Sequence, residues 1–453
     1  MPSAAEYKTL LKLGLPIMVG QLGTIVTGFV DNMMVGHYST AALAAASFCN
    51  NFFNMALLAV MGFTYGITPL VAALSARAGR ESETGALMRT AARVNAVFCA
   101  AVMAVMAALF FMVGNMGQPA ELLPLIRPYY LLCLAGLLPV MIFNVWAQWS
   151  YGIGNTATPM WIVLGVNVLN VLGNWLLIYG VGAFPELGLT GAGISTLLAR
   201  LVSGVAMVWV FFSLRRYRAY RAGYRLSPRL SPRRSSAPRR RAAAKIWRTS
   251  LPVSLQLTCE TAAFSGSAVL CGWLGTVPLA AFQVVIVLGT LGFVVYYALG
   301  AAVAVRVGNA AGTGDRAAMR SSAWAGYHIM LGVMLLSSLT FALAGPAIIS
   351  LFTDDLTVRA VAVSLIVPLI LYQLGDATQI TFANALRGTS RVMPMLWSAL
   401  FSYLVLGLPS TYLLAFTFGL GVYGIILSFS VSLFTAAALY LFFFLRSTRP
   451  LSP

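Results

Sequence analysis

Three acidic residues lie within or near long apolar runs, where a charged side chain is costly, and they are the positions at which this sequence could do chemistry. They are Asp31, Glu260 and Asp376; the other eight of the 11 acids fall in loops or at the ends of the runs. A carboxylate at the centre of a membrane helix costs roughly 2.5 to 3.5 kcal/mol even on a lenient scale. We therefore expect these acids to bind a cation, carry a proton or pair with polar groups.

Asp31 has candidate partners in two later apolar runs. Asn170 and Asn174 are four residues apart and so share one helix face, and Ala192 and Thr196 repeat that spacing. Side-chain oxygens from Asp31, Asn170, Asn174 and Thr196, together with a backbone carbonyl, would suit a hard monovalent cation or a proton relay. The alternative is polar contact that only holds helices together.

The other two acids lie in the second half of the chain. Asp376 follows Tyr372 by four residues, which places the ring and the carboxylate on one helix face. With Glu260, this pair could hold a cation or a substrate between carboxylate and ring. The alternative is partial exposure of the two acids at helix ends. Arg200 lies inside the sixth run, and three roles stay open for it: pairing with an acid, snorkelling to the membrane surface, or lining the bundle interior.

The elements that must position these residues are membrane helices. The chain has 453 residues, of which 60% are hydrophobic and 9% charged, and its mean hydropathy is +0.86. Soluble domains carry roughly 25% charged residues. Runs of about 20 apolar residues predict about twelve spans, near 10–36, 43–76, 89–115, 123–150, 159–183, 189–214, 246–273, 279–308, 318–345, 356–385, 392–417 and 421–446.

The two halves of the chain repeat. Leu15-Pro16 and Leu251-Pro252 are 236 residues apart, and the same offset pairs Gly36 with Gly272. The sequence therefore predicts an all-α integral membrane protein with two pseudo-symmetric six-helix lobes and a site between them. The expected domains are an N-lobe at 1–220, a basic linker at 221–244 and a C-lobe at 245–453. Pro16 and Pro252 are expected to bend their helices and free backbone carbonyls.

Basic residues set the expected orientation. Of the 29 Lys and Arg residues, 13 lie between Arg215 and Arg248, a stretch without acids. This local cluster explains the net charge of +18 without nucleic acid. Because basic loops stay cytoplasmic, both termini and the linker are expected inside the cell (inner) membrane. The linker is expected to be a solvated, mobile tether, with contact to anionic lipids as the alternative. The first apolar run is expected to be a retained membrane helix rather than a cleaved leader.

Several functions are disfavoured. The sequence contains no Walker phosphate loop, no GxSxG elbow and no HExxH. Its five cysteines sit in apolar runs without metal-ligand spacing, and its two histidines stand alone. We therefore expect no enzyme, no cofactor, no metal site beyond a possible monovalent Na⁺ and no obligate protein partner, with an ion gradient as the driving force.

The chain resembles the multidrug and toxic compound extrusion (MATE) transporters over nearly its whole length, and within them the NorM-like branch. The resemblance rests on Gly28-Phe29-Val30-Asp31 with Gly36, on the run Leu257 to Ser265, on Tyr372-Gln373 leading to Asp376, Gln379 and Ala385 to Gly388, and on Asn170, Asn174 and Trp175. It implies a V-shaped pair of six-helix lobes that exchange drugs or toxins for sodium or protons. It also implies that Glu260, Asp376 and Asp31 are the working acids. Some relatives carry an aspartate where Asn174 stands, so the N-lobe site is less negative here.

The expected mechanism is antiport by alternating access. A carboxylate that holds a proton or Na⁺ cannot at the same time counter a cationic, amphipathic substrate, so ion entry expels the substrate. One alternative is an exporter dedicated to a single natural product or metabolite. Another is a flippase for lipid-linked precursors, which would need a basic cavity. A passive channel is disfavoured because no Gly-rich filter or charged ring repeats between the halves.

Overall fold

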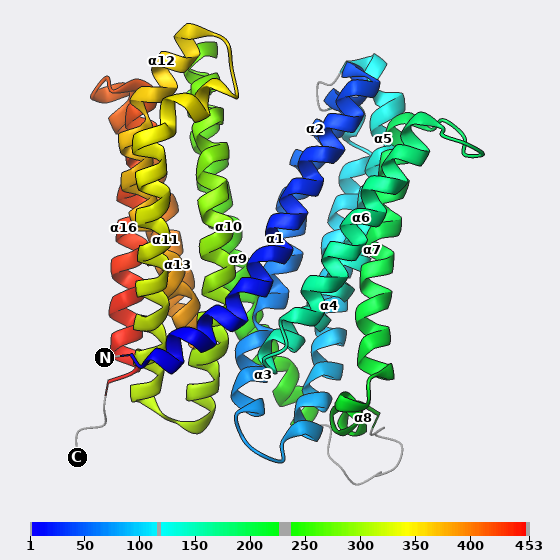
Figure 1. The fold of residues 1–453 in the computed structure, drawn as a ribbon, viewed down its shortest axis with the longest axis vertical. Coiled ribbons are helices and arrows are strands. Elements are labelled where there is room, and N and C mark those ends of the chain that lie inside the picture. Colours follow the sequence, from blue (N-terminus) through cyan, green and yellow to red (C-terminus); the bar gives the residue numbers. More distant parts are fainter. Residues whose placement is uncertain (1, 116–118, 226–236, 450–453) are drawn as a thin grey trace. The chain divides into compact units, whose positions relative to one another are not determined.

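The computed structural model describes residues 2–115, 119–225 and 237–449, and all regular structure in these ranges is helical (Figure 1). Ten helices are long and apolar enough to cross a membrane, or eleven if the bent pair α12 and α13 counts as one span. The protein is therefore a multi-pass membrane protein. The one remaining predicted span corresponds to α9 (Ala237–Gly272), which has the length but not the apolarity, because Gln256, Glu260 and several Ser and Thr residues interrupt it. Residues 226–236 of the predicted basic linker lie outside the described residues.

The chain forms two compact units. One contains Val19–Ser254, and the other contains Met1–Met18 together with Leu255–Pro453. The chain passes from one unit to the other inside α1 (Ala4–Tyr38) and inside α9, in both cases two residues after the prolines predicted to bend these helices. A division at the basic linker stays a prediction.

In the unit Val19–Ser254, α5 packs against α2, α3, α4 and α7, and α6 packs against α7. The hydrophobic core lies along this central helix, with Tyr130, Val145 and Trp149 at 0 to 2% exposure. Besides the second part of α1 and the start of α9, the unit contains α2 (Thr40–Tyr65), α3 (Ile67–Ser75), α4 (Glu81–Phe110), α5 (Leu123–Gly152), α6 (Ala157–Tyr179), α7 (Gly188–Ser213), α8 (Arg218–Arg225) and the short 3₁₀ turns η1 (Val113–Asn115), η2 (Ala120–Leu122) and η3 (Arg215–Tyr217).

In the other unit, α13 is the central helix and packs against α10, α11 and α16. Figure 1 shows α10, α11, α13 and α16 running side by side. Its elements are the start of α1, the rest of α9, α10 (Thr276–Thr313), α11 (Arg316–Ser350), α12 (Leu356–Ser364), α13 (Ile366–Gly388), α14 (Met393–Ala399), η5 (Leu400–Gly407), α15 (Leu408–Tyr412), η6 (Leu413–Thr417) and α16 (Gly421–Ser447). The segments η5 and η6 are π-helical.

Local sequence signals explain several helix ends. Asp315 begins α11 by accepting a hydrogen bond from the Ala318 backbone N–H at 2.8 Å, and Asp355 caps α12 in the same way. These side chains satisfy backbone N–H groups that have no partner in the first turn of a helix. At the other end, α10 stops at Gly314, whose φ of +80° suits a residue without a Cβ.

The start of α1 is anchored to α10 and α11 by polar contacts. The Arg306 guanidinium donates to both carboxylate oxygens of Glu6, at 3.0 and 2.7 Å, and the Ser322 hydroxyl donates to Glu6 as well. One residue later, the Tyr7 hydroxyl lies 2.7 Å from Nδ1 of His328. A bidentate ion pair of this kind fixes both the register and the orientation of the first turn of α1.

The Glu6–Arg306 pair gives a stability prediction. We expect Glu6→Gln to lower the free energy of unfolding by about 1 to 2 kcal/mol, because the half-buried guanidinium loses its charged partner. The double variant Glu6→Arg with Arg306→Glu should recover part of this loss. Thermal unfolding of the purified protein measures the effect. Glu83→Gln is the matched control, since the Arg80–Glu83 pair is exposed; equal losses in Glu6→Gln and Glu83→Gln would contradict the anchoring role.

Candidate functional site

Asp31 is held by an amide from a neighbouring helix. Asn174 on α6 donates from Nδ2 to Asp31 Oδ1 at 2.6 Å. Asn174 is completely buried, and its carbonyl oxygen Oδ1 has no hydrogen-bond partner among the described residues. A buried amide oxygen without a donor is costly. The geometry therefore leaves an unsatisfied oxygen directly beside a carboxylate, which is the donor chemistry of a hard cation.

Asn170, one turn earlier on α6, reaches the same carboxylate. One atom of its amide group lies 3.0 and 3.2 Å from the two Asp31 oxygens, and the other faces the hydroxyls of Ser195 and Thr196 at 3.3 and 3.4 Å. With the nitrogen toward Asp31, the amide donates to the carboxylate. With the oxygen toward Asp31, two acceptors face each other and need a proton or cation between them. Both orientations place Asn170 at the carboxylate.

Close packing of α6 on α7 (Gly188–Ser213) makes this arrangement possible. A Cβ on Gly173 would lie 2.5 Å from the Ser195 hydroxyl, and a Cβ on Gly191 would lie 2.3 Å from the Leu177 carbonyl oxygen. Glycines at these points let the two backbones approach, as small residues do in membrane bundles. Ala192 is buried one turn before Thr196 on α7. Its carbonyl as a ligand stays a prediction.

Glu260 has a similar arrangement in the second unit. Gln379 on α13 donates from Nε2 to Glu260 Oε1 at 2.9 Å, and Gln256, one turn earlier on α9, donates to Oε2 at 2.7 Å. The carbonyl oxygen of Gln379 has no hydrogen-bond partner among the described residues. Asp376 is 5% exposed and close enough to interact with both Glu260 and Gln379. Two buried carboxylates therefore share one site.

Four partners of Glu260 were not predicted from the sequence as site residues: Gln379, described above, and Gln256, Tyr403 and Tyr440. Gln256 is four residues before Glu260, a spacing that places both on one face of α9 and could have identified it. The buried hydroxyls of Tyr403 and Tyr440 also lie close enough to interact with Glu260. These come from η5 and α16, and no local pattern connects them to α9.

Tyr372 is buried one turn before Asp376 on α13, as its spacing predicted. The Tyr372 hydroxyl occupies the space that a Cβ on Gly289 of α10 would fill, so a glycine at this position leaves room for it. The Tyr372 ring also contacts the Phe429 ring edge-on, with 6.0 Å between the ring centroids. The role of this ring in holding a cation stays a prediction.

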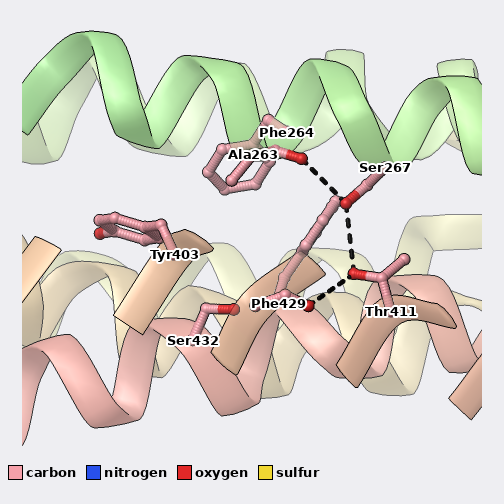
Figure 2. Close-up of a pocket in the computed structure, with 8 residues that line it drawn as sticks. Ala263, Phe264, Ser267, Tyr403, Thr411, Phe429 and Ser432 are labelled. Carbon is pink, nitrogen blue, oxygen red and sulfur yellow. Dashed lines mark hydrogen bonds between the residues drawn. The ribbon is translucent and has the colours of Figure 1, made fainter. Parts of the chain in front are cut away.

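A small hydroxyl-lined pocket lies next to Glu260 along α9. Ala263, Phe264 and Ser267 follow Glu260 at spacings of three, four and seven residues, so all four share one helix face. Figure 2 shows the pocket, where the Ser267 and Thr411 hydroxyls are 3.3 Å apart. Behind the lining residues, the Thr411 hydroxyl also lies 2.7 Å from the Ser428 hydroxyl. The pocket has room for about one water molecule. Its remaining lining residues are Tyr403, Gly407, Phe429 and Ser432.

One residue of this pocket corresponds to Asp31 in the internal sequence repeat. Ser267 follows Asp31 by 236 residues, the offset that relates Pro16 to Pro252. The second unit therefore carries a hydroxyl where the first carries a carboxylate, and its own carboxylate, Glu260, stands two turns earlier on the helix. The sites of the two units are similar in chemistry but do not occupy equivalent positions.

A comparison with known protein families detects both halves of this repeat. The model of the MatE family matches residues 16–176 and again residues 252–413. The chain is 31% identical over 408 residues to the "Probable multidrug resistance protein NorM" of Xanthomonas axonopodis pv. citri, covering 90% of this chain and 86% of that one. It is 31% identical over 425 residues to the "Multidrug resistance protein PmpM" of Pseudomonas aeruginosa, with 91% and 85% covered.

Solved structures give the same fold. The eukaryotic MATE transporter AtDTX14 superimposes with a TM-score of 0.85 at 17% identity, covering 98% of each chain. An outward-facing MATE family transporter of the MOP superfamily gives a TM-score of 0.85 at 20% identity, covering 98% of this chain and 96% of that one. The predicted all-α membrane fold of this family is confirmed.

The packing of α6 on α7 allows the Asp31 site to be tested with a substitution that removes no polar group. We expect Gly173→Ala to lower thermal stability and weaken any cation-dependent function, because the added methyl group displaces Ser195 and with it Asn170. Gly165→Ala on the same helix is the control, since nothing lies within 4 Å of its Cβ. In that open position alanine should stabilise the helix by about 0.5 to 1 kcal/mol. Identical behaviour of the two variants would argue against the close packing.

Proposed function

Because this chain belongs to the MatE family of transporters, we propose that it is an antiporter that exports amphipathic, mainly cationic drugs or other toxic compounds in exchange for Na⁺ or H⁺. The observation that carries the proposal is a carboxylate inside each unit, partly buried at Asp31 and buried at Glu260, that is held by an amide whose own oxygen has no hydrogen-bond partner among the described residues. Oxygen atoms placed in this way are ready to receive a cation or a proton.

Competition for these carboxylates supplies the coupling. Asp31 in one unit, and Glu260 with Asp376 in the other, can neutralise either a coupling ion or the positive group of a substrate. An ion that binds from the outside would therefore displace the substrate, and departure of the ion toward the inside would restore the negative charge. Only a ligand that binds the two access states unequally can shift the balance between them, and this requirement applies to ion and substrate alike.

The substrate class follows from the carboxylates and from the names of relatives. NorM and PmpM are named as multidrug resistance proteins, and we extend this activity to the chain. The second unit's site combines two carboxylates with the rings of Tyr372 and Phe429 nearby. Carboxylates and aromatic faces both favour organic cations.

The proposed setting is the cell (inner) membrane, with both termini and the basic linker on the cytoplasmic side. This orientation rests on the distribution of Lys and Arg, which accumulates positive charge in alternate loops. Amphipathic substrates and membrane lipids are the proposed partners, and no cofactor beyond the coupling ion is required.

Neutralising the carboxylates tests the proposal. We expect Asp31→Asn and Glu260→Gln each to reduce ethidium efflux by about tenfold or more, since each removes a charge to which both the ion and the substrate bind. Efflux should be measured in inverted vesicles with sodium and proton gradients imposed separately, so that the driving ion is identified. Asp354→Asn is the control, because Asp354 is a fully exposed acid outside the sites.

A second readout separates binding from folding. If a carboxylate binds the coupling ion, that ion should raise the thermal stability of wild type by mass action and lose this effect in the corresponding variant. Normal efflux in both Asp31→Asn and Glu260→Gln would overturn the proposed mechanism. Wild type that moves ethidium under neither gradient would point instead to a dedicated exporter of one compound or to a lipid-precursor flippase.

A further inference from the structure

A short basic helix, α8, follows the end of the membrane-spanning helix α7 almost directly. Helix α7 ends at Ser213, Leu214 is extended with a ψ of 130°, and the turn η3 then leads into α8. Figure 1 shows α8 at the end of α7, turned away from the axis of that helix. A helix that lies across the end of a membrane span runs along the membrane surface, at the level of the lipid headgroups.

Aromatic rings anchor one side of this segment to α5 and α7. Tyr217, in the turn before α8, and Tyr220 meet the ring of the buried Trp149 edge-on, with 5.6 and 5.2 Å between the ring centroids. Tyr224 meets the Phe211 ring in the same way at 5.5 Å. Edge-to-face pairs of this kind add to the stabilisation from burial. The anchored side therefore fixes which side of α8 faces outward.

Close backbone packing against α4 holds α8 further. A Cβ on Gly223 of α8 would overlap the carbonyl oxygen of Ser82, and a Cβ on Gly85 of α4 would overlap the carbonyl oxygen of Tyr220. Glycine at both positions lets the two helix backbones touch. Helix α8 is thus a fixed part of the first unit.

The outward side of α8 carries two arginines with a small residue between them. Arg218, Ala222 and Arg225 are spaced by four and three residues, so they share one helix face, and all three are exposed. We call this surface the α8 basic face. Its two guanidinium groups originate about two turns apart, and the alanine between them leaves space for a ligand.

Two further arginines of this segment are already engaged within the protein. The Arg216 guanidinium donates to the Thr158 hydroxyl at 2.8 Å and lies over the Tyr217 ring. Arg221 donates to the backbone carbonyl oxygen of Phe212. Neither one is therefore counted in the α8 basic face.

The described part of the chain supplies no anion to the α8 basic face. Neither Arg218 nor Arg225 forms an ion pair or a hydrogen bond with a described residue. Of the acids on the adjoining helix α4, Glu81 interacts with Tyr220, and Glu83 pairs with Arg80. The sequence from 226 to 236 adds three arginines and no acid. A balancing anion therefore has to come from outside the chain.

We propose that the α8 basic face binds the phosphate groups of anionic phospholipids at the membrane surface. A guanidinium suits this ligand because its fork of N–H groups donates to phosphate oxygens in pairs. A basic segment beside a membrane span is also attracted to an anionic bilayer surface. The proposal rests on the membrane setting given under the proposed function, whose lipid partner it supplies with residues, and it does not depend on the transported substrate.

A lipid titration tests the proposal. Phosphatidylglycerol is added to the purified full-length protein in a neutral detergent, and the rise in melting temperature gives the apparent affinity by mass action. We expect the double variant Arg218→Gln with Arg225→Gln to weaken this affinity about twentyfold, or about fivefold for each charge. The double variant Arg446→Gln with Arg449→Gln removes two exposed arginines elsewhere and should weaken it less than about twofold.

A matched pair of single variants guards against misfolding and against unspecific charge effects. Ala222→Glu places an acid between the two arginines and should weaken the affinity for phosphatidylglycerol about fivefold or more. Ala219→Glu adds the same charge to the same exposed helix, but at a position about 100° or more around the helix from both arginines. It should weaken the affinity much less than Ala222→Glu does. Melting temperatures without lipid show whether each variant is folded.

Several outcomes would overturn the proposal. These are equal losses in the two double variants, equal losses in the two alanine variants, and a wild type that responds to phosphatidylcholine as strongly as to phosphatidylglycerol. An equal response to inorganic phosphate would assign the α8 basic face to a soluble anion instead. Ethidium efflux is not part of this readout, so a wild type without efflux would overturn the export proposal and leave the lipid site standing.

Discussion

The hydrogen bond between a buried side-chain amide and a carboxylate inside the helix bundle is the interaction on which the rest of this structure depends. An isolated carboxylate in an apolar interior is too costly to persist, so each unit must bring polar groups from other helices to it. Asn174 does this for Asp31, and Gln379 does it for Glu260. The requirement fixes which helix faces meet. It also explains the glycines at the α6–α7 contact, since a few tenths of an ångström decide whether the amide reaches the acid.

The same repeat produces two chemically different sites. Asp31 has Ser267 as its repeat counterpart, and Glu260 has Thr24, so neither carboxylate is duplicated. The second unit gathers two carboxylates in one site, whereas the first holds one, with Arg200 close enough to interact with it electrostatically. A net negative site favours a coupling cation more strongly than a balanced one.

A proline precedes each of the two points at which the chain crosses from one compact unit to the other. The chain crosses from one compact unit to the other two residues after Pro16 and two residues after Pro252. A proline inside a helix removes one backbone hydrogen bond and so locally weakens the helix. The crossings thus coincide with the points where α1 and α9 bend most easily. Before the first crossing, the Glu6–Arg306 ion pair holds the beginning of α1 to α10.

The sequence by itself determined the membrane class, most helix positions and the internal repeat, and it pointed to three acids whose function stays a prediction. Hydropathy and the cost of charge act residue by residue, so they can be read along the chain without knowing what touches what. The spacing of Asn170 and Asn174 predicted a shared helix face, and both side chains lie at the Asp31 carboxylate; their role as ligands stays a prediction. Only the tertiary structure decided that Gln379, Tyr403 and Tyr440 join Gln256 around Glu260, and that Arg200 lies against Gly136. These features depend on the register and tilt of helices packed against one another, and a helical period fixes which residues share a face but not which face of another helix they meet.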